Sequence, residues 1–213
     1  MKERLIKYKA ILMPICMMAL QGLLFLLVKP FQHNIHMLSG TIDESIPFIN
    51  YSIFIYSSWY ILLVLVPYLL YKKDKTMLAK YVASYIICVI IAMIVFVVYP
   101  TGVIRPEVNN DNIVNMIVNL IYWVDTPAIN CLPSLHCAIS MLFILVMLVS
   151  KKFNTKTKTI ITILSILIML STLFTKQHVL IDLITGNILM TIVFLYVNYN
   201  KKLVNKTKKM LKI

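Results

Sequence analysis

Charged residues are scarce in this sequence. They occupy only 14% of the 213 positions, whereas apolar residues occupy 60%, and the mean hydropathy is +0.85. A soluble globular domain of this length does not have such a composition. The chain also lacks internal repeats, linkers and low-complexity stretches, so we expect one membrane domain over residues 1–213. The composition therefore predicts an integral membrane protein.

Cysteine is also rare, with four residues in the chain. Cys16 and Cys88 fall within apolar runs, where cysteine packs as a small hydrophobic residue. Cys131 and Cys137 flank a short polar motif, and their spacing across a predicted helix start disfavours a disulfide between them. The cysteines therefore indicate no redox function.

Six apolar runs have, or nearly have, the length needed to cross a bilayer core of roughly 30 Å at about 1.5 Å per residue. The first is expected to be retained and not cleaved as a signal peptide, because it is long and ends at Lys29-Pro30 without a small-residue cleavage site. The pattern predicts an all-α bundle of six transmembrane helices, placed at residues 10–29, 50–71, 81–99, 136–150, 159–175 and 178–198.

Basic residues outnumber acidic ones by 21 to 8, and their positions predict the orientation of the bundle. A cytoplasmic N-terminus puts every basic residue except Lys29, Arg105 and Lys176 on the inner side, as the positive-inside rule requires. Six spans then place both termini on the cytoplasmic side, and the expected location is the cell membrane. Because the positive charge is spread over all inner segments, it indicates contact with anionic lipid headgroups and not with nucleic acid.

Polar residues at the outer ends of the spans are the candidates for chemistry. His178 and Asp182 are four residues apart at the start of the sixth span, which predicts that they share one helical face. A hydrogen bond from one ring nitrogen of His178 to Asp182 would fix the tautomer and leave the other nitrogen as a nucleophile. The alternative is a capped helix start that carries a structural histidine.

Two further stretches fall on the same side. Pro133-Ser134 suits a helix start, where the Ser134 hydroxyl and free backbone N–H groups can hold a phosphate. His136 then follows in position to protonate a leaving alkoxide. Arg105 offers a planar fork of donors for phosphate oxygens. Taken singly, these residues also fit an ordinary helix cap with a bystander histidine and a solvated loop arginine.

Together, the three stretches resemble the type 2 phosphatidic acid phosphatases, a family of integral membrane enzymes. The family's pattern is KxxxxxxRP, then PSGH, then SRxxxxxHxxxD. The order and the three spacings agree over about residues 98–186, where the chain has Val98-x6-Arg105-Pro106, Pro133-Ser134-Leu135-His136 and Ser171-Thr172-x5-His178-x3-Asp182.

The chain departs from the family pattern at three positions. Val98 replaces a lysine and Thr172 replaces an arginine, so two phosphate-binding cations are missing, and Lys176 is a candidate replacement. Leucine at position 135 and two tracts resemble the inositol phosphorylceramide synthase branch, whose members transfer a phospho-headgroup between lipids. The two tracts are Asp125-Thr126-Pro127-Ala128-Ile129-Asn130 and Thr175-Lys176-Gln177-His178.

The resemblance implies a lipid phosphate phosphatase that works at the outer face without a cofactor or metal. His178 would attack phosphorus, Asp182 would orient it, and His136 would protonate the leaving oxygen. The residues implied to hold the substrate are Arg105, Ser134 and Lys176 on the phosphate oxygens, with Asp125 and Asn130 as further candidate contacts. The substrate would be a membrane lipid phosphomonoester or pyrophosphate, and the oligomeric state stays open.

Three alternatives to this interpretation remain at the level of sequence. The first is a lipid headgroup phosphotransferase, like the inositol phosphorylceramide synthases, that uses the same histidines. The second is a transporter or non-catalytic membrane protein with a proton relay, which the position of the polar residues at span ends disfavours. The third is a zinc site made of His136, His178 and Asp182, which the motif pattern also disfavours.

Overall fold

The computed structural model describes residues 2–213, with side chains described from Leu12 onward. Helices make up 74% of the chain, which agrees with the predicted all-α class. In chain order the elements are α1 (Lys2–Val28), a 3-10 turn η1 (Lys29–Phe31), β1 (His36–Met37), α2 (Thr41–Ser45), α3 (Ser52–Lys73), α4 (Lys75–Val98), β2 (Thr101–Gly102), α5 (Ile113–Val124), α6 (Leu135–Val149), α7 (Thr155–Phe174), α8 (Leu180–Tyr199) and α9 (Lys201–Leu211).

Five of these helices, α1, α3, α4, α7 and α8, are long and apolar enough to cross a membrane. The chain is therefore a multi-pass membrane protein, as its composition predicted. The expected fourth span corresponds to α6, which is apolar but has only 15 residues. A helix of that length rises about 22 Å, so it is shorter than a bilayer core of roughly 30 Å.

The predicted boundaries were wrong at the connection between α3 and α4. The sequence suggested a polar loop over residues 72–80, but Asp74 alone separates the two helices. Its carboxylate accepts hydrogen bonds from the Met77 backbone N–H at 2.9 Å and from the Ser150 hydroxyl at 2.7 Å. A capping residue at this point lets α4 begin at Lys75, six residues earlier than predicted.

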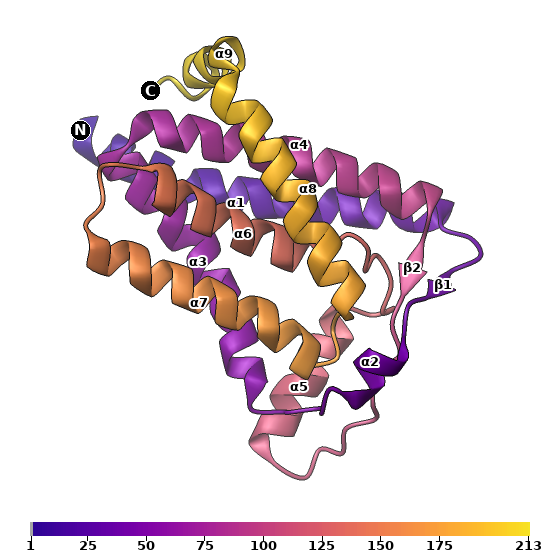
Figure 1. Cartoon of the computed structure of the whole chain (residues 1–213). Coiled ribbons are helices and arrows are strands. Elements are labelled where there is room, and N and C mark those ends of the chain that lie inside the picture. Colours follow the sequence, from indigo (N-terminus) through magenta and orange to yellow (C-terminus); the bar gives the residue numbers. More distant parts are fainter. Residues whose placement is uncertain (1) are drawn as a thin grey trace.

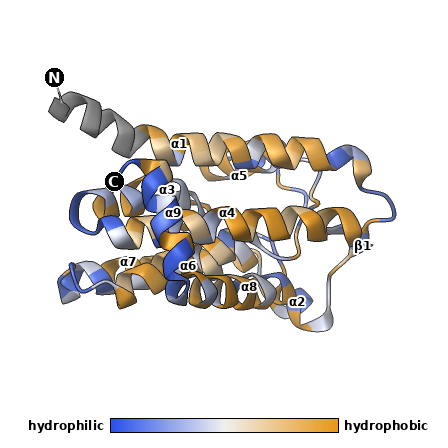
Figure 2. Ribbon diagram, turned by 90° about the horizontal axis from the view of Figure 1, so that it is seen from above, coloured by the Kyte–Doolittle hydropathy of each residue, from blue (hydrophilic) through white to orange (hydrophobic). Residues whose placement is uncertain are grey.

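The long helices lie side by side, and the short elements gather at one end of the bundle (Figures 1 and 2). We call this the loop end; it holds α2, the two strands, and the segment between α5 and α6. The start of α1, the α3–α4 connection and the amphipathic α9 lie at the opposite, terminal end. In Figure 2 the long helices are hydrophobic over most of their length, whereas α9 carries a hydrophilic face.

The core forms around α6, which packs against α3, α4, α7 and α8. Its side chains Ile139, Leu142 and Phe143 are fully buried. Because α6 is surrounded by these helices, its first turn is held in place by packing. That turn carries His136, one of the predicted catalytic histidines. The apolar cluster therefore fixes the place where three polar stretches meet.

Two strands connect the loops at the loop end. β1 and β2 pair in parallel, with His36 opposite Thr101 and Met37 opposite Gly102, and Gly102 also bridges to Ile129. A Cβ on Gly102 would lie 2.9 Å from the Ala128 carbonyl oxygen, so this close approach requires glycine. The pairing holds the segment that carries Arg105 next to the segment that leads into α6.

Candidate active site

His178 and Asp182 meet as predicted, but by a different route. His178 lies in the turn before α8, not on the helix, so the expected shared helical face was wrong. Asp182 is in the first turn of α8, and its Oδ2 accepts hydrogen bonds from the Val179 backbone N–H at 3.1 Å and from His178 Nδ1 at 3.2 Å. The same carboxylate oxygen thus caps the helix and fixes the His178 ring.

The turn that brings His178 to this place depends on the end of α7. Lys176 adopts a left-handed conformation, with φ of 52°, directly after the helix. The following backbone N–H groups of Gln177 and His178 then donate to the Thr172 carbonyl at 3.0 and 3.2 Å. This arrangement is a common way to end a helix, and it reverses the chain toward α8.

His136 lies in the first turn of α6 and faces His178. Its Nδ1 is 3.5 Å from His178 Nε2, and its Nε2 is 2.9 Å from the Tyr56 hydroxyl of α3. The Trp59 ring lies against the imidazole, with ring centroids 4.4 Å apart. Tyr56 and Trp59 are buried, so helix α3 supports the His136 ring from one side.

These contacts allow one consistent order of donors and acceptors. If His178 donates from Nδ1 to Asp182, its Nε2 carries a lone pair. His136 can donate from Nδ1 to that lone pair and accept at Nε2 from the Tyr56 hydroxyl. In this order the electron pair on His178 Nε2 accepts the hydrogen bond from His136, and it becomes available for attack when that contact opens.

Arg105 is held by a network at the edge of the site. Its guanidinium pairs with the Asp125 carboxylate at 2.5 Å, donates to Gln177 Oε1, and lies 4.8 Å from the centre of the Tyr122 ring. Within residues 12–213, its buried Nε has no hydrogen-bond partner. Because Gln177 directly precedes His178, this network places a cation with a spare donor beside the histidines.

Asp125 provides the negative charge for this network and lies outside the long helices. Burial raises the pKa of the Asp125 carboxyl above its ordinary value, and the Arg105 guanidinium opposes part of that rise. As the pH falls, Asp125 therefore protonates sooner than an ordinary aspartate, and the ion pair is lost with it. The predicted direct contact between Asp125 and substrate stays a prediction.

Ser134 is the N-cap of α6, as the sequence predicted. Its hydroxyl oxygen accepts a hydrogen bond from the Cys137 N–H at 3.2 Å, and its backbone N–H donates to the Asp182 carbonyl at 3.2 Å. The side chain is fully buried. The Ser134 backbone N–H is therefore not available to a phosphate. The hydroxyl hydrogen takes part in neither of these two hydrogen bonds and could still be donated.

Gly186 allows α8 to approach the start of α6. A Cβ on Gly186 would lie 2.4 Å from the Ser134 carbonyl oxygen, which is too close for any other residue without a shift. The two candidate stretches, one at the start of each helix, are thus brought together by a backbone contact. Sequence reasoning did not identify this glycine, although the chain contains only four.

Lys176 and Asn130 are the predicted site residues whose surroundings differ most from expectation. The Lys176 ammonium donates to the Asp43 and Ile46 carbonyls at 2.7 and 2.5 Å, so it is directed to α2 and not toward His136. Asn130 has φ of 65° and is buried, with Oδ1 accepting from Gln32. The role of Lys176 in binding phosphate and that of Asn130 as a substrate contact stay predictions.

Two cavities meet at His178. The first, of about 380 Å³, has an apolar side formed by α1 and α3, including Met18, Phe25 and Leu63, and a polar end at His136 and His178. The second, of about 330 Å³, reaches His178 from the side of α2 and Arg105. The first cavity therefore combines an apolar side with a polar end, which suits an amphiphilic ligand.

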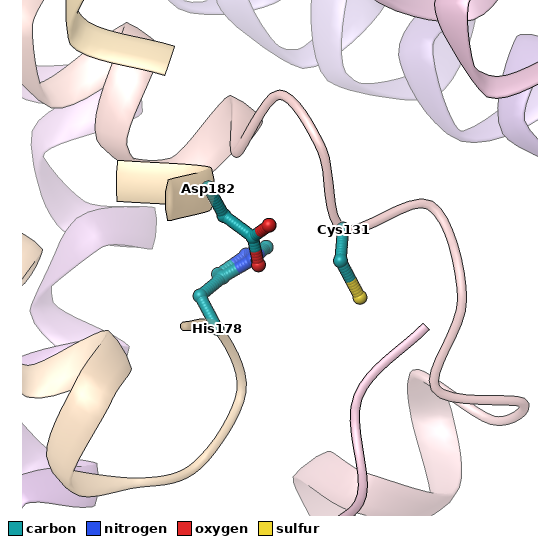
Figure 3. Close-up of side chains that lie close together, drawn as sticks. All are labelled: Cys131, His178 and Asp182. Carbon is teal, nitrogen blue, oxygen red and sulfur yellow. The ribbon is translucent and has the colours of Figure 1, made fainter. Parts of the chain in front are cut away.

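One group near the histidines has the composition of a metal site. Potential ligand atoms of Cys131, His178 and Asp182 lie within 4.8 Å of one another, and all three residues are buried (Figure 3). Cys131 was not assigned a role from the sequence. The zinc site considered there used His136 in place of Cys131.

Sequence reasoning missed Tyr56 and Gln177 as well. Tyr56 is one of twelve tyrosines and lies 80 residues from His136 in the chain, so no local pattern indicated their contact. Gln177 could have been predicted as a site residue from its position directly before His178, because a polar side chain there lies near any substrate bound at that histidine.

Comparison with known proteins agrees with this geometry. A family model described as the PAP2 superfamily matches residues 31–196, a range that contains all three motifs. Neither the curated proteins nor the solved structures provide a match. The match confirms the resemblance to type 2 phosphatidic acid phosphatases and leaves the inositol phosphorylceramide synthase branch unassigned. The chain belongs to the PAP2 superfamily.

Proposed function

We propose that the protein is a lipid phosphate phosphatase that works without a metal through a phosphohistidine intermediate. The observation that carries the proposal is the opposition of His178 Nε2 and His136 Nδ1 at 3.5 Å, at the polar end of an apolar cavity. The two imidazoles can supply a nucleophile and a general acid, which are the two groups that cleavage of a phosphate ester needs.

The first step joins His178 Nε2 to phosphorus. In the substrate complex His136 is doubly protonated, the second proton coming from solvent or from the phosphate monoanion. As the N–P bond forms, the bond from phosphorus to the lipid oxygen breaks, and that oxygen takes a proton from His136. Asp182 holds the other nitrogen of His178 and stabilises the positive charge that develops on the ring. Arg105 offers its free Nε–H to a phosphate oxygen.

The second step releases the phosphate. His136, now neutral, takes a proton from water as the water oxygen attacks phosphorus, and the N–P bond breaks. The sum of both steps is lipid ester plus water giving alcohol plus phosphate, and both histidines return to their starting states. Tyr56 suits this cycle because its hydroxyl can donate to neutral His136 and accept from protonated His136.

The substrate class follows from the cavity. A phosphate at His178 places the attached chain between α1 and α3, among apolar side chains. Of the five long helices, α1 is the least buried by protein, so a lipid chain can reach the cavity at this side of the bundle. We therefore propose an amphiphilic phosphomonoester or pyrophosphate whose chain stays in the membrane.

The topology that we propose has six spans, of which α6 is the fourth, with both termini in the cytoplasm and the site on the extracytoplasmic side. Its support is the distribution of basic residues, of which only Lys29, Arg105 and Lys176 lie on the site's side. In intact cells, a membrane-impermeant thiol reagent should label Asn109→Cys and spare Lys156→Cys. The reverse labelling pattern would contradict this orientation.

Purified protein tests the proposed activity directly. We would incubate it in detergent with phosphatidate, phosphatidylglycerol phosphate and undecaprenyl pyrophosphate, in the presence of a chelator, and measure free phosphate. We expect release from at least one lipid, and its loss in His178→Ala. If none of the lipids releases phosphate, or if release stops when chelator is added, the proposed metal-free phosphatase is wrong.

A further inference from the structure

The cluster of Cys131, His178 and Asp182 offers three different donor types at one point. Their sulfur, nitrogen and oxygen ligand atoms lie within 4.8 Å of one another, and each side chain is at least nine-tenths buried. In Figure 3 the Asp182 carboxylate extends over the His178 ring toward the loop that carries Cys131. Ligands around a tetrahedral zinc ion lie about 2.0–2.3 Å from the metal, so a small inward movement would complete the set.

A second observation points to a missing partner at the same place. Asp182 is fully buried, and its Oδ2 accepts from His178 and from the Val179 backbone N–H. Within the part of the chain whose side chains are described, the other oxygen, Oδ1, has no hydrogen-bond partner. A buried carboxylate oxygen without a partner is costly, and a bound cation would satisfy it.

We propose that Cys131, His178 and Asp182 form an inhibitory binding site for a zinc-type cation. The proposal rests on the proposed function, because inhibition requires that His178 is the nucleophile. Thiolate, imidazole and carboxylate are the ligands that Zn²⁺ takes in proteins. Mg²⁺ and Ca²⁺ bind oxygen ligands and do not favour a thiolate, so the site discriminates against them.

Inhibition follows from the atoms that the cation would occupy. A cation on His178 Nε2 blocks the attacking electron pair. A cation on Nδ1 replaces the hydrogen bond to Asp182 and moves the ring proton to Nε2, which removes the attacking electron pair. Binding also takes the thiol proton of Cys131, which leaves to solvent, and no oxidant or reductant is involved.

Cobalt spectroscopy tests binding without any assay of turnover. Co²⁺ replaces Zn²⁺ in such sites, and a cysteine ligand gives a thiolate-to-cobalt charge-transfer absorption. We expect this absorption with the full-length wild-type protein and with Cys16→Ser, a matched loss of an exposed cysteine in α1. We expect it to be absent in Cys131→Ser. Absence of the absorption in wild-type protein would overturn the proposal.

If Cys131→Ser folds poorly, a measurement on the wild-type protein alone can still test the proposed site. X-ray absorption at the zinc edge of protein loaded with one equivalent of Zn²⁺ should give one sulfur neighbour, with the remaining neighbours nitrogen or oxygen. A shell with no sulfur would overturn the site. Because neither spectrum depends on turnover, these results stand even if the proposed phosphatase activity is wrong.

Phosphate release in buffers of controlled free zinc tests the inhibitory role. We expect Zn²⁺ to slow wild-type turnover, chelator to restore it, and Mg²⁺ or Ca²⁺ to have no such effect. With each protein compared with its own rate without zinc, Cys131→Ser should need about tenfold more Zn²⁺ for the same fractional inhibition, since it lacks the soft ligand. Equal sensitivity in both proteins, stimulation by Zn²⁺, or cysteine-dependent binding without inhibition would overturn the proposal.

Discussion

His178 Nε2 and His136 Nδ1 lie 3.5 Å apart and face one another from the starts of two different helices. Each ring has its other nitrogen engaged, by Asp182 on one side and by Tyr56 on the other. A phosphoryl group cannot fit within this gap, so the rings have to separate when substrate binds. In the mechanism that we propose, a bound phosphate therefore replaces the contact between these two nitrogens.

The role of His136 as general acid predicts a dependence on the leaving group. His136→Ala should slow hydrolysis of an alkyl lipid phosphate by about 10²–10⁴-fold, because the alkoxide then leaves without a proton. An aryl phosphate, whose leaving oxygen needs no proton, should be affected far less. Steady-state rates on both substrates check this, and an equal loss on both would remove His136 from the acid role.

Tyr56 is predicted to act as a positioning residue through His136. Tyr56→Phe removes the hydroxyl at 2.9 Å from His136 Nε2 and should lower kcat about tenfold while KM stays near its wild-type value. The loss should again be larger for alkyl than for aryl phosphates. Tyr81→Phe, at a tyrosine of equal burial in α4, is the control and should leave both constants unchanged. A change in KM alone would indicate a merely structural role.

The shape of the Arg105 side chain is predicted to matter as much as its charge. One terminal nitrogen donates to the Asp125 carboxylate and to Gln177, and the other donates to the Asp125 and Tyr122 carbonyls, which leaves Nε for the substrate. Arg105→Ala and Arg105→Lys should both lower kcat/KM by about 10²–10³-fold, since lysine lacks the fork. Kinetics on the best lipid substrate would check this. If the lysine variant kept wild-type activity, a simple point charge would be enough.

Gly186 is predicted to control the approach of α8 to α6. Gly186→Ala forces its Cβ against the Ser134 carbonyl and should destabilise the protein by about 1–3 kcal/mol while displacing His178 from His136. Gly22→Ala is the matched control, because a Cβ there meets nothing within 4 Å among the described residues. The thermal unfolding temperature in detergent should fall only for Gly186→Ala, and phosphate release by that variant should fall with it. An unchanged unfolding temperature would contradict this account.

Much of this architecture could be predicted from the sequence because hydrophobic runs and motif spacing are local patterns. The all-α class and the cap at Ser134 follow from such patterns. The contact of His178 with Asp182 was also predicted, but from a shared helical face that the turn before α8 replaces. The early start of α4 could not be predicted, because it depends on Asp74 capping one helix while it binds Ser150 of another.

The supporting residues of the site escaped prediction for a related physical reason. The contact of Tyr56 with His136 is created by the packing of α3 on α6, which the sequence does not encode locally. Lys176 was linked to the phosphate because it lies near His178 in the chain. A left-handed backbone at that residue turns its side chain toward α2 instead.

The most direct test of the account is a search for phosphate on His178. Protein mixed briefly with a lipid labelled in its phosphate and then quenched should retain label in a linkage that is stable to alkali and labile to acid. We predict that His178→Ala retains none, whereas His33→Ala, at an exposed histidine of the same loop end, retains the wild-type amount. Labelling or normal turnover in His178→Ala would contradict the central claim that His178 is the nucleophile.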